Sequence, residues 1–328
     1  MTDASMPPPA APPKPSAPPP PPSRPPSSAD DVHDLRPPRN QWWDVWDQFK
    51  THKGAMAGML VFVSIILFVT VGPWIWQVDP GLIDIRSRNL GSSWTHPMGT
   101  DQLGRDLLAR MMYGGRVSVA VGLMAMLLGI VLGTLIGVLA GYFKLLDAPL
   151  MRTTDLFLAL PLLPLLLILV ALFRDVLEGV FGQAMGVFTL IVVAIAITSW
   201  MQTARIVRGD VLALKEREFV LAARSIGTPS RRINTRHILP NVMSPIMVSA
   251  TLGIASAIIT ESALSFLGLG FPPDFPTWGR ILYDGRDWIE QYPARVVWPG
   301  VFISLTVLSV NFIGDGLRDA LDPRIRGR

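Results

Sequence analysis

Residues 117–143 read VSVAVGLMAMLLGIVLGTLIGVLAGYF, a run of 27 residues without a charged side chain. A helix of about 20 apolar residues crosses the hydrocarbon core of a bilayer, so this run is long enough to span a membrane. Further uncharged runs occupy residues 54–78, 156–173, 179–204, 238–260 and 296–314. Because helices satisfy their own backbone polar groups in lipid, we predict an all-α, polytopic membrane protein with six transmembrane helices.

The composition of the 328 residues excludes several other classes of protein. Charged residues make up 16% of the chain, against roughly 25% in a typical soluble chain, and the mean hydropathy is +0.39. The chain has no cysteine, which excludes disulfides and thiolate metal sites. Its four histidines show no metal-ligand spacing. We therefore expect no metal site and no bound cofactor in this chain.

The distribution of basic residues predicts the orientation in the membrane. The segment 205–237, between the fourth and fifth uncharged runs, holds eight Lys or Arg and three Asp or Glu. Short basic loops stay on the cytoplasmic side. With six spans, both termini are then cytoplasmic. The net charge of +4 follows from this topology, so the basicity predicts no nucleic-acid partner.

The chain divides into five predicted segments. Residues 1–40 are rich in proline and predict a disordered cytoplasmic tail; a polyproline ligand for a partner domain is the alternative. Residues 41–53 predict an amphipathic helix at the membrane interface, in contact with lipid, because Trp42, Trp46 and Phe49 recur at helical spacing. The remaining segments are the first transmembrane helix with its outer loop (54–112), a transmembrane core (113–317) and a cytoplasmic tail (318–328).

The cytoplasmic loop 205–240 is predicted to form a helix, a break and a second helix. Residues 218–226 are good helix formers, and Gly227 can take the left-handed conformation that ends a helix. Ser230 can cap a second helix that stops before Pro240. A bent pair of helices suits docking to a soluble partner, whereas an ordinary basic loop is the alternative. The apolar side chains available for docking are Phe219, Leu221 and Ile226.

This loop is similar to the EAA loop of ABC-importer permeases. Leu221-Ala222-Ala223 occupies the Glu-Ala-Ala positions, with Gly227 and Leu239-Pro240 in register. The leading glutamate is replaced by Leu221, a departure that bears on any salt bridge from that position. Other motifs resemble those of oligopeptide and dipeptide importer permeases, C-type subunit, from about residue 42 to the end. They are HPMGTDQLGRD (96–106), RHILPN (236–241), ESALSFLGLG (261–270) and GDGLRDALDPR (314–324).

The resemblance implies a type I ABC importer permease fold in the plasma membrane of a bacterium, with a definite set of partners. A second homologous permease chain would complete the pathway as a heterodimer, and two ATPase subunits would bind ATP-Mg. An extracytoplasmic peptide-binding protein would deliver a peptide substrate. Loop 205–240 would be the coupling loop. The residues expected to couple to the ATPase are Glu218, Phe219, Leu221, Ala222, Ala223, Arg224, Ile226, Gly227 and Arg231.

Several features of the predicted spans have two interpretations. The glycines at 129, 133, 137 and 141 share one helix face, which indicates either close packing within the chain or a gating surface. Pro161 and Pro164 are expected to bend the third span, either to line a pathway or to fit neighbouring helices. Glu261 is the one acid within a span; it is either part of a pathway or gate, or it reaches water at the interface.

The outer loops carry the remaining candidates. The stretch from Thr100 to Met112 is predicted to be a short amphipathic helix capped by Thr100. Asp101, Arg105 and Asp106 on it are either solvated charges or contacts to the binding protein. Residues 271–295 are expected to fold over the outer mouth.

We expect this chain to be a pathway subunit without catalytic residues, because it has no Gly-x4-Gly-Lys-Ser/Thr phosphate loop. A nickel importer permease of the same superfamily is the nearest rival interpretation. A secondary transporter fits the topology but would need a proton relay, and Glu261 stands alone. A membrane scaffold whose proline-rich arm recruits partners is a third class.

Overall fold

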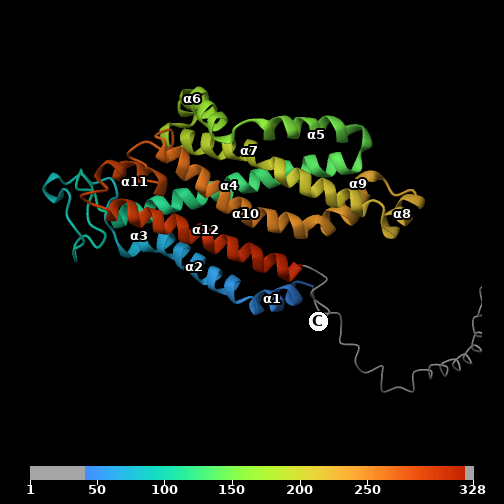
Figure 1. Ribbon diagram of the computed structural model, residues 1–328, viewed down its shortest axis with the longest axis horizontal. Helices are drawn as coiled ribbons and strands as arrows, with labels where there is room; N and C mark the ends of the chain where they lie inside the picture. The colour runs from blue at the N-terminus through green and yellow to red at the C-terminus, as the bar shows by residue number, and fades with distance from the viewer. Residues whose placement is uncertain (1–40, 322–328) are drawn as a thin grey trace, which may run out of the picture. The chain divides into compact units, whose positions relative to one another are not determined.

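The computed structural model describes residues 41–321 (Figure 1). The proline-rich segment 1–40 and residues 322–328 of the predicted C-terminal tail lie outside the described residues. The predictions made for those two segments therefore stay predictions.

Residues 41–321 are built from helices. The isolated bridge between Thr100 and Asp106 is the one extended pairing among them. The α-helices are α1 (Gln41–Thr51), α2 (Lys53–Thr70), α3 (Gly72–Ile75), α4 (Leu107–Tyr142), α5 (Lys144–Ala159), α6 (Leu162–Phe181), α7 (Gln183–Leu214), α8 (Glu218–Ser225), α9 (Ser230–Ile233), α10 (Leu239–Phe266), α11 (Trp278–Gly285) and α12 (Ala294–Leu321). Short 3-10 turns lie at Ile85–Ser87 and Arg286–Trp288, and a π-helical segment, η3, at Asn234–Ile238.

Among the described residues, five helical segments are long and apolar enough to cross a membrane. They are Lys53–Ile75, Leu107–Tyr142, Gln183–Leu214, Ser230–Phe266 and Ala294–Leu321. The pair α5 and α6 passes the same test together, but the two helices meet at an angle of 91°. Counted as one broken span, this pair brings the total to six. The prediction of an all-α polytopic membrane protein is confirmed.

The third predicted span is not a single helix, and a proline explains the break. Leu160 is extended (φ −76°, ψ 137°), as expected for a residue that precedes a proline. Pro161 then precedes the first turn of α6, which turns away from α5 (Figure 1). Pro164 lies within the first turn of α6 and breaks nothing, because a proline near a helix start removes no needed hydrogen bond. The predicted bend therefore comes from Pro161 alone.

Helices α4 and α7 touch through backbone. A Cβ added at Gly133 would lie 2.6 Å from the carbonyl oxygen of Trp200, and one at Gly137 would lie 2.6 Å from that of Ala204. At Gly129 and Gly141, an added Cβ would meet side-chain atoms of α7 at 2.5 and 2.7 Å. The glycine face is therefore an intrachain packing surface, as the first of its two interpretations held.

Helix α1 forms as predicted, and its aromatic side chains differ in burial. Phe49 is 4% exposed and packs with Val45, Ala55 and Ala320, at the base of α2 and α12. Trp46 is 39% exposed and stacks on Phe49. Phe49 therefore contacts protein, although it shares the helical spacing of Trp42 and Trp46. The position of α1 at a membrane interface stays a prediction.

No separate helix spans residues 100–112, contrary to the expectation. Residues from 107 onward are the first turns of the continuous helix α4, and Asp106, not Thr100, is its N-cap. Asp106 is extended (φ −66°, ψ 120°), and its side chain accepts a hydrogen bond from the backbone N–H of Ala109, which is the usual N-cap arrangement. The predicted boundary between segments 54–112 and 113–317 thus falls inside α4.

We expect Gly137→Ala to destabilise the folded protein by about 1–3 kcal/mol, the range for overpacking. The new Cβ would press on the carbonyl of Ala204 and on Val207 at 2.6 and 2.8 Å. Gly209 of α7 is the matched control, because an added Cβ there meets nothing within 4 Å. Both substitutions gain the same helix propensity. The midpoint of thermal unfolding in detergent should fall only for Gly137→Ala; equal midpoints would contradict the backbone contact.

Candidate functional site

The elbow, formed by α8, residues 226–229 and α9, connects α7 to α10 at one end of the helices. Gly227 has a φ of +79°. The backbone N–H of Thr228 donates to the carbonyl of Ala223 over 3.1 Å, and that of Gly227 donates to Arg224 over 3.0 Å. These two bonds and the left-handed glycine make a Schellman motif, which ends α8 sharply. The predicted helix, break and second helix are confirmed.

The second helix of the elbow differs from the expectation in two details. Pro229 takes the N-cap position of α9, and Ser230 is its first helical residue without a side-chain cap. The helix also does not stop before Pro240. The π-helical segment η3 carries the chain into α10, with the N–H of Leu239 bonded to the carbonyl of Asn234. The wider turn makes room for a proline ring that would clash in an α-helix.

The elbow has a buried inner face and an exposed outer face. Val220, Ala223 and Ile233 are buried in a cluster with Val207 and Val211 of α7, Ile238 of η3, and Val242 and Ile246 of α10. On the outer face, Phe219 is 44% exposed, Leu221 41% and Ile226 83%. Of the predicted coupling residues, Ala223 thus faces inward. Those on the exposed side are Glu218, Phe219, Leu221, Ala222, Arg224, Ile226, Gly227 and Arg231.

Polar contacts hold the base of the elbow to the neighbouring helices. Lys215 follows α7, and its Nζ donates to the carbonyl of Gly141 over 3.0 Å. Arg208 of α7 pairs with Asp147 of α5, with Nη2 and Oδ2 2.8 Å apart. The guanidinium of Arg224 lies 5.9 Å from the ring centroid of Tyr142. The elbow therefore contacts α4 through Arg224, and α7, which leads into the elbow, is joined to α4 and α5.

A groove lies between α7, α10 and the corner where α5 meets α6. Its volume is about 300 Å³. It is lined by Met126, Phe157, Leu158, Leu160, Leu162, Leu165, Ile195, Thr198, Ser199, Met201, Gln202, Thr203, Ile206, Ser249, Leu252, Gly253, Ser256, Ala257 and Thr260. Leu160 and Leu162 flank Pro161, so the proline break shapes one wall of the groove. Pro161 and Pro164 do not themselves line it, and their part in a pathway stays a prediction.

Glu261 is fully buried near the opposite end of α10. Ser118 of α4 donates to its Oε2 over 3.0 Å, and Ser265 donates to its Oε1 over 2.8 Å. Ser118 also accepts the backbone N–H of Trp278 over 3.2 Å. The carboxyl group thus joins α4, α10 and α11. The interpretation in which Glu261 reaches water at the interface is wrong, and its role in a pathway or gate stays a prediction.

Asp101 and Arg105 belong to a buried ionic cluster at the end of the helices opposite the elbow, which we call the cap end. Arg105 Nε donates to Asp101 Oδ2 over 2.6 Å. Arg110 of α4 donates to Asp284 of α11 over 3.2 Å, and Arg105 lies 3.6 Å from the same carboxylate. Arg105 and Arg110 are 3% and 2% exposed. The interpretation of these residues as solvated charges is wrong; their contact with a binding protein stays a prediction.

Asp106 is also buried and has three partners. It caps α4, accepts a hydrogen bond from Trp76 Nε1 over 3.1 Å, and lies 2.8 Å from His96 Nδ1. Asp106 thus joins the loop after α3 to the start of α4. Residues 271–295 meet the same loop, since Arg295 donates to the side chain of Asn89 and to the backbone of Thr100.

The sequence did not reveal Arg110, Asp284 and Arg295 at the cap end, or Ser118 and Ser265 around Glu261. Two of these contacts join distant parts of the chain: Asp284 lies 174 residues from Arg110, and Ser118 lies 143 residues from Glu261. Arg110 did leave a signal, because it stands in an otherwise apolar helix start, LLARMM. A charge in such a place needs a buried partner. Nothing in the sequence identifies Asp284 as that partner.

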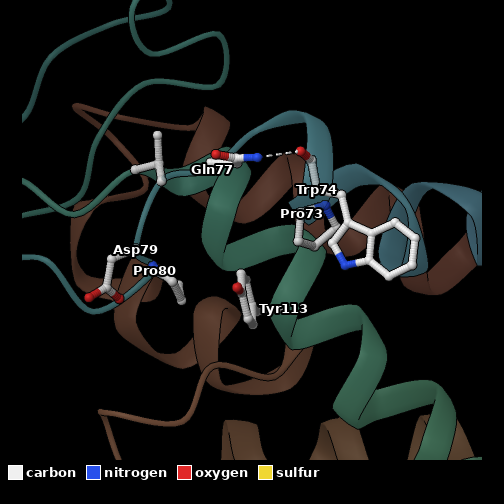
Figure 2. Close-up of a pocket in the computed structure, with 7 residues that line it drawn as sticks. Pro73, Trp74, Gln77, Asp79, Pro80 and Tyr113 are labelled. Carbon is white, nitrogen blue, oxygen red and sulfur yellow. Dashed lines mark hydrogen bonds between the residues drawn. The ribbon is translucent and has the colours of Figure 1, made fainter.

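A second cavity, of about 530 Å³, opens beside α3 at the cap end (Figure 2). Figure 2 shows Trp74 and Tyr113 among its walls, with Asp79 and Pro80 on the loop that follows. Gln77 Nε2 donates to the carbonyl of Trp74 over 3.0 Å. Trp74 is 74% exposed, as aromatic residues at a membrane–water boundary commonly are. This cavity lies away from the elbow and from the groove.

Residues 41–321 contain no group of three or more His, Asp or Glu side chains placed to hold a metal ion. The candidate site consists of the exposed elbow face, the groove, the buried hydrogen bonds of Glu261 and the ionic cluster at the cap end. Such an arrangement can transmit movement and line a path.

Two family models match the chain. One is described as "Binding-protein-dependent transport system inner membrane component" and covers residues 129–327. The other, described as "N-terminal TM domain of oligopeptide transport permease C", covers residues 40–91. Between them, the two models account for most of the described chain.

Curated relatives match at similar levels of identity. The chain is 38% identical over 286 residues to the oligopeptide transport system permease protein OppC of Bacillus subtilis, covering 87% of this chain and 90% of that protein. It is 38% identical over 290 residues to the di/tripeptide transport system permease protein DppC of Pseudomonas aeruginosa, with 86% and 92% covered.

Among solved structures, an inward-facing MetNI methionine ABC transporter chain matches with a TM-score of 0.52 and 19% identity, covering 66% of this chain and 97% of that one. At this identity, the likeness concerns the fold alone.

We expect Asp106→Ala to lower the stability of the protein by roughly 1–3 kcal/mol, because it removes a helix cap and leaves buried donors without an acceptor. Asp106→Asn should lose less stability than Asp106→Ala, since the amide oxygen of Asn can still accept the capping hydrogen bond of α4. Asp79→Ala is the control: Asp79 is exposed and accepts one local hydrogen bond. Thermal unfolding in detergent measures all three. If Asp106→Ala left the stability unchanged but weakened the affinity for the binding protein, Asp106 would be a partner contact and not a structural residue.

Proposed function

Because this chain belongs to the family of binding-protein-dependent transport system inner membrane components, we propose that it is the permease subunit of an ATP-driven importer of dipeptides or oligopeptides. The peptide substrate is supported by the names of the relatives, which are oligopeptide and di/tripeptide transport permeases. The importer would contain a second permease chain, two ATPase subunits that bind ATP-Mg, and an extracytoplasmic binding protein. The protein is a multi-pass membrane protein of the inner membrane.

The proposal rests on one observation: the helices that hold the elbow also line the groove. The inner face of the elbow packs on α7 through Val207 and Val211, and on α10 through Val242 and Ile246. The groove is lined by α7 from Ile195 to Ile206 and by α10 from Ser249 to Thr260. A displacement of the elbow would therefore move both groove walls as rigid bodies. A chain without a Gly-x4-Gly-Lys-Ser/Thr phosphate loop would need such a link to an external motor.

The exposed face of the elbow would rest on an ATPase subunit. Phe219, Leu221 and Ile226 supply apolar contacts, whereas Arg224 and Arg231 supply charges at the rim of the surface. Few-residue hot spots of this kind carry most of the energy of an interface. The elbow end and both termini are then cytoplasmic, and the cap end with α11 faces outward. The ionic cluster would keep the outer loops in one shape for the binding protein.

Peptide uptake tests the function. Proteoliposomes containing this chain, its partner permease and the ATPases should accumulate labelled dipeptide when ATP is inside and the binding protein is outside. Omitting ATP should abolish the uptake, whereas a protonophore should leave it unchanged. Accumulation of nickel instead of peptide would favour a nickel importer. Accumulation by this chain alone, without ATPases, would contradict the proposal and favour a secondary transporter.

Ile226→Arg tests the docking face. Ile226 is 83% exposed on the elbow, so a charge there should not disturb the fold but should remove an apolar contact. We expect the ATPase to bind on the order of ten- to a hundredfold less tightly, the range of a hot-spot residue. Trp94→Arg is the control, because Trp94 is 99% exposed in the loop before α4. ATPase that co-purifies equally with both variants would show that this face is not the contact.

A further inference from the structure

The groove at the α5–α6 corner is lined without charge. None of the described residues around it is Asp, Glu, Lys or Arg. The polar groups among its lining residues are Thr198, Ser199, Gln202, Thr203, Ser249, Ser256 and Thr260. In α10, residues 249, 256 and 260 are spaced by seven and four, so they lie on one face of the helix. The groove therefore carries hydroxyl rows from two helices, together with a single amide.

Several of these hydroxyls already donate their hydrogen within their own helix. Thr198 donates to the carbonyl of Ala194 over 3.0 Å, and Thr260 donates to that of Ser256 over 2.8 Å. A hydroxyl group has one donor hydrogen and two acceptor lone pairs. When the hydrogen is used inside the helix, the oxygen is left as an acceptor. These positions therefore offer acceptors to a solute that brings N–H groups.

Lipid is a poor occupant for this surface. Acyl chains offer no hydrogen-bonding groups, so polar side chains in spans face the protein interior or a water-filled cavity. Ser256 is exposed on the groove face of α10, whereas Ile259 on the same helix is 49% exposed and does not line the groove. The volume of about 300 Å³ is at the lower end of the ~300–1,000 Å³ of small-molecule sites.

We propose that this groove is the wall that the chain contributes to the solute path, and that it contacts the backbone N–H groups of a peptide. The wall then accepts peptides whatever the charge of their side chains, because it has acceptors but no ionised group. This inference rests on the proposed function and adds to it the residues that meet the substrate and the chemistry that they recognise.

A single cysteine at Ser256 tests the proposal, because the natural chain has no cysteine. Ser256→Cys changes one atom of the side chain and adds no volume of consequence. The complex is treated with a negatively charged or a positively charged methanethiosulfonate reagent, and labelling of this chain is measured by mass spectrometry. Ile259→Cys, on an exposed apolar face of α10 outside the groove, is the matched control. The complex with the natural chain reports labelling of other subunits.

We expect Ser256→Cys to be labelled and Ile259→Cys to stay unlabelled. Uptake of an acidic, a neutral and a basic dipeptide is then measured before and after labelling. The ratio of the two rates is compared between peptides, because any preference of the binding protein affects both rates equally. The negative label should depress acidic relative to neutral peptide uptake by about tenfold, as expected for unit charges ~10 Å apart at an effective dielectric constant of ~20. The positive label should instead depress basic relative to neutral peptide uptake.

Two results would overturn the inference. An unlabelled Ser256→Cys would show that another chain or lipid covers the groove. Equal effects of both labels on all three peptides would show that the groove does not meet the solute. Failure of the proposed function looks different: the complex with the natural chain would take up no peptide with ATP, whether or not Ser256→Cys is labelled.

Discussion

Backbone contact between α4 and α7 is the constraint on which the other features depend. Four glycines, at positions 129, 133, 137 and 141, let the two helices approach until added Cβ atoms would meet carbonyl and side-chain atoms at 2.5–2.7 Å. In lipid, no hydrophobic force drives helices together, so close packing of small residues has to do so. This contact holds α7 in place, and α7 carries both the base of the elbow and one wall of the groove.

Apolar packing stabilises one end of the helices, and ion pairs stabilise the other. At the elbow end, buried aliphatic side chains such as Val220 and Ile233 pack the elbow against α7 and α10. The outer face of the elbow stays exposed. At the cap end, the buried Arg110 pairs with the partly buried Asp284 and joins α4 to α11. Removing one partner of a buried ion pair leaves an uncompensated charge, at a cost of about 3–5 kcal/mol.

The break between α5 and α6 shapes the groove that we propose as part of the solute path. Pro161 turns α6 by 91° and opens a corner next to α7 and α10. Interrupted helices are tolerated in membranes where they border protein or a water-filled cavity. The same proline that breaks the third span thus shapes one wall of the groove. Glu261, one residue after the groove-lining Thr260, ties α10 to α4 and α11.

The sequence by itself determined the helical class, the places of five spans, the Gly227 turn and the glycine contact face. These depend on local rules, namely apolar length, the left-handed freedom of glycine and helical spacing. Tertiary structure decided the rest. Arg110 pairs with Asp284, and Ser118 contacts Glu261, across more than 90 residues of the chain. Ala223 faces inward because neighbouring helices cover its side of α8. Pro161 could bend the third span by local rules, but the size of the angle depends on α7 and α10 packed beside it.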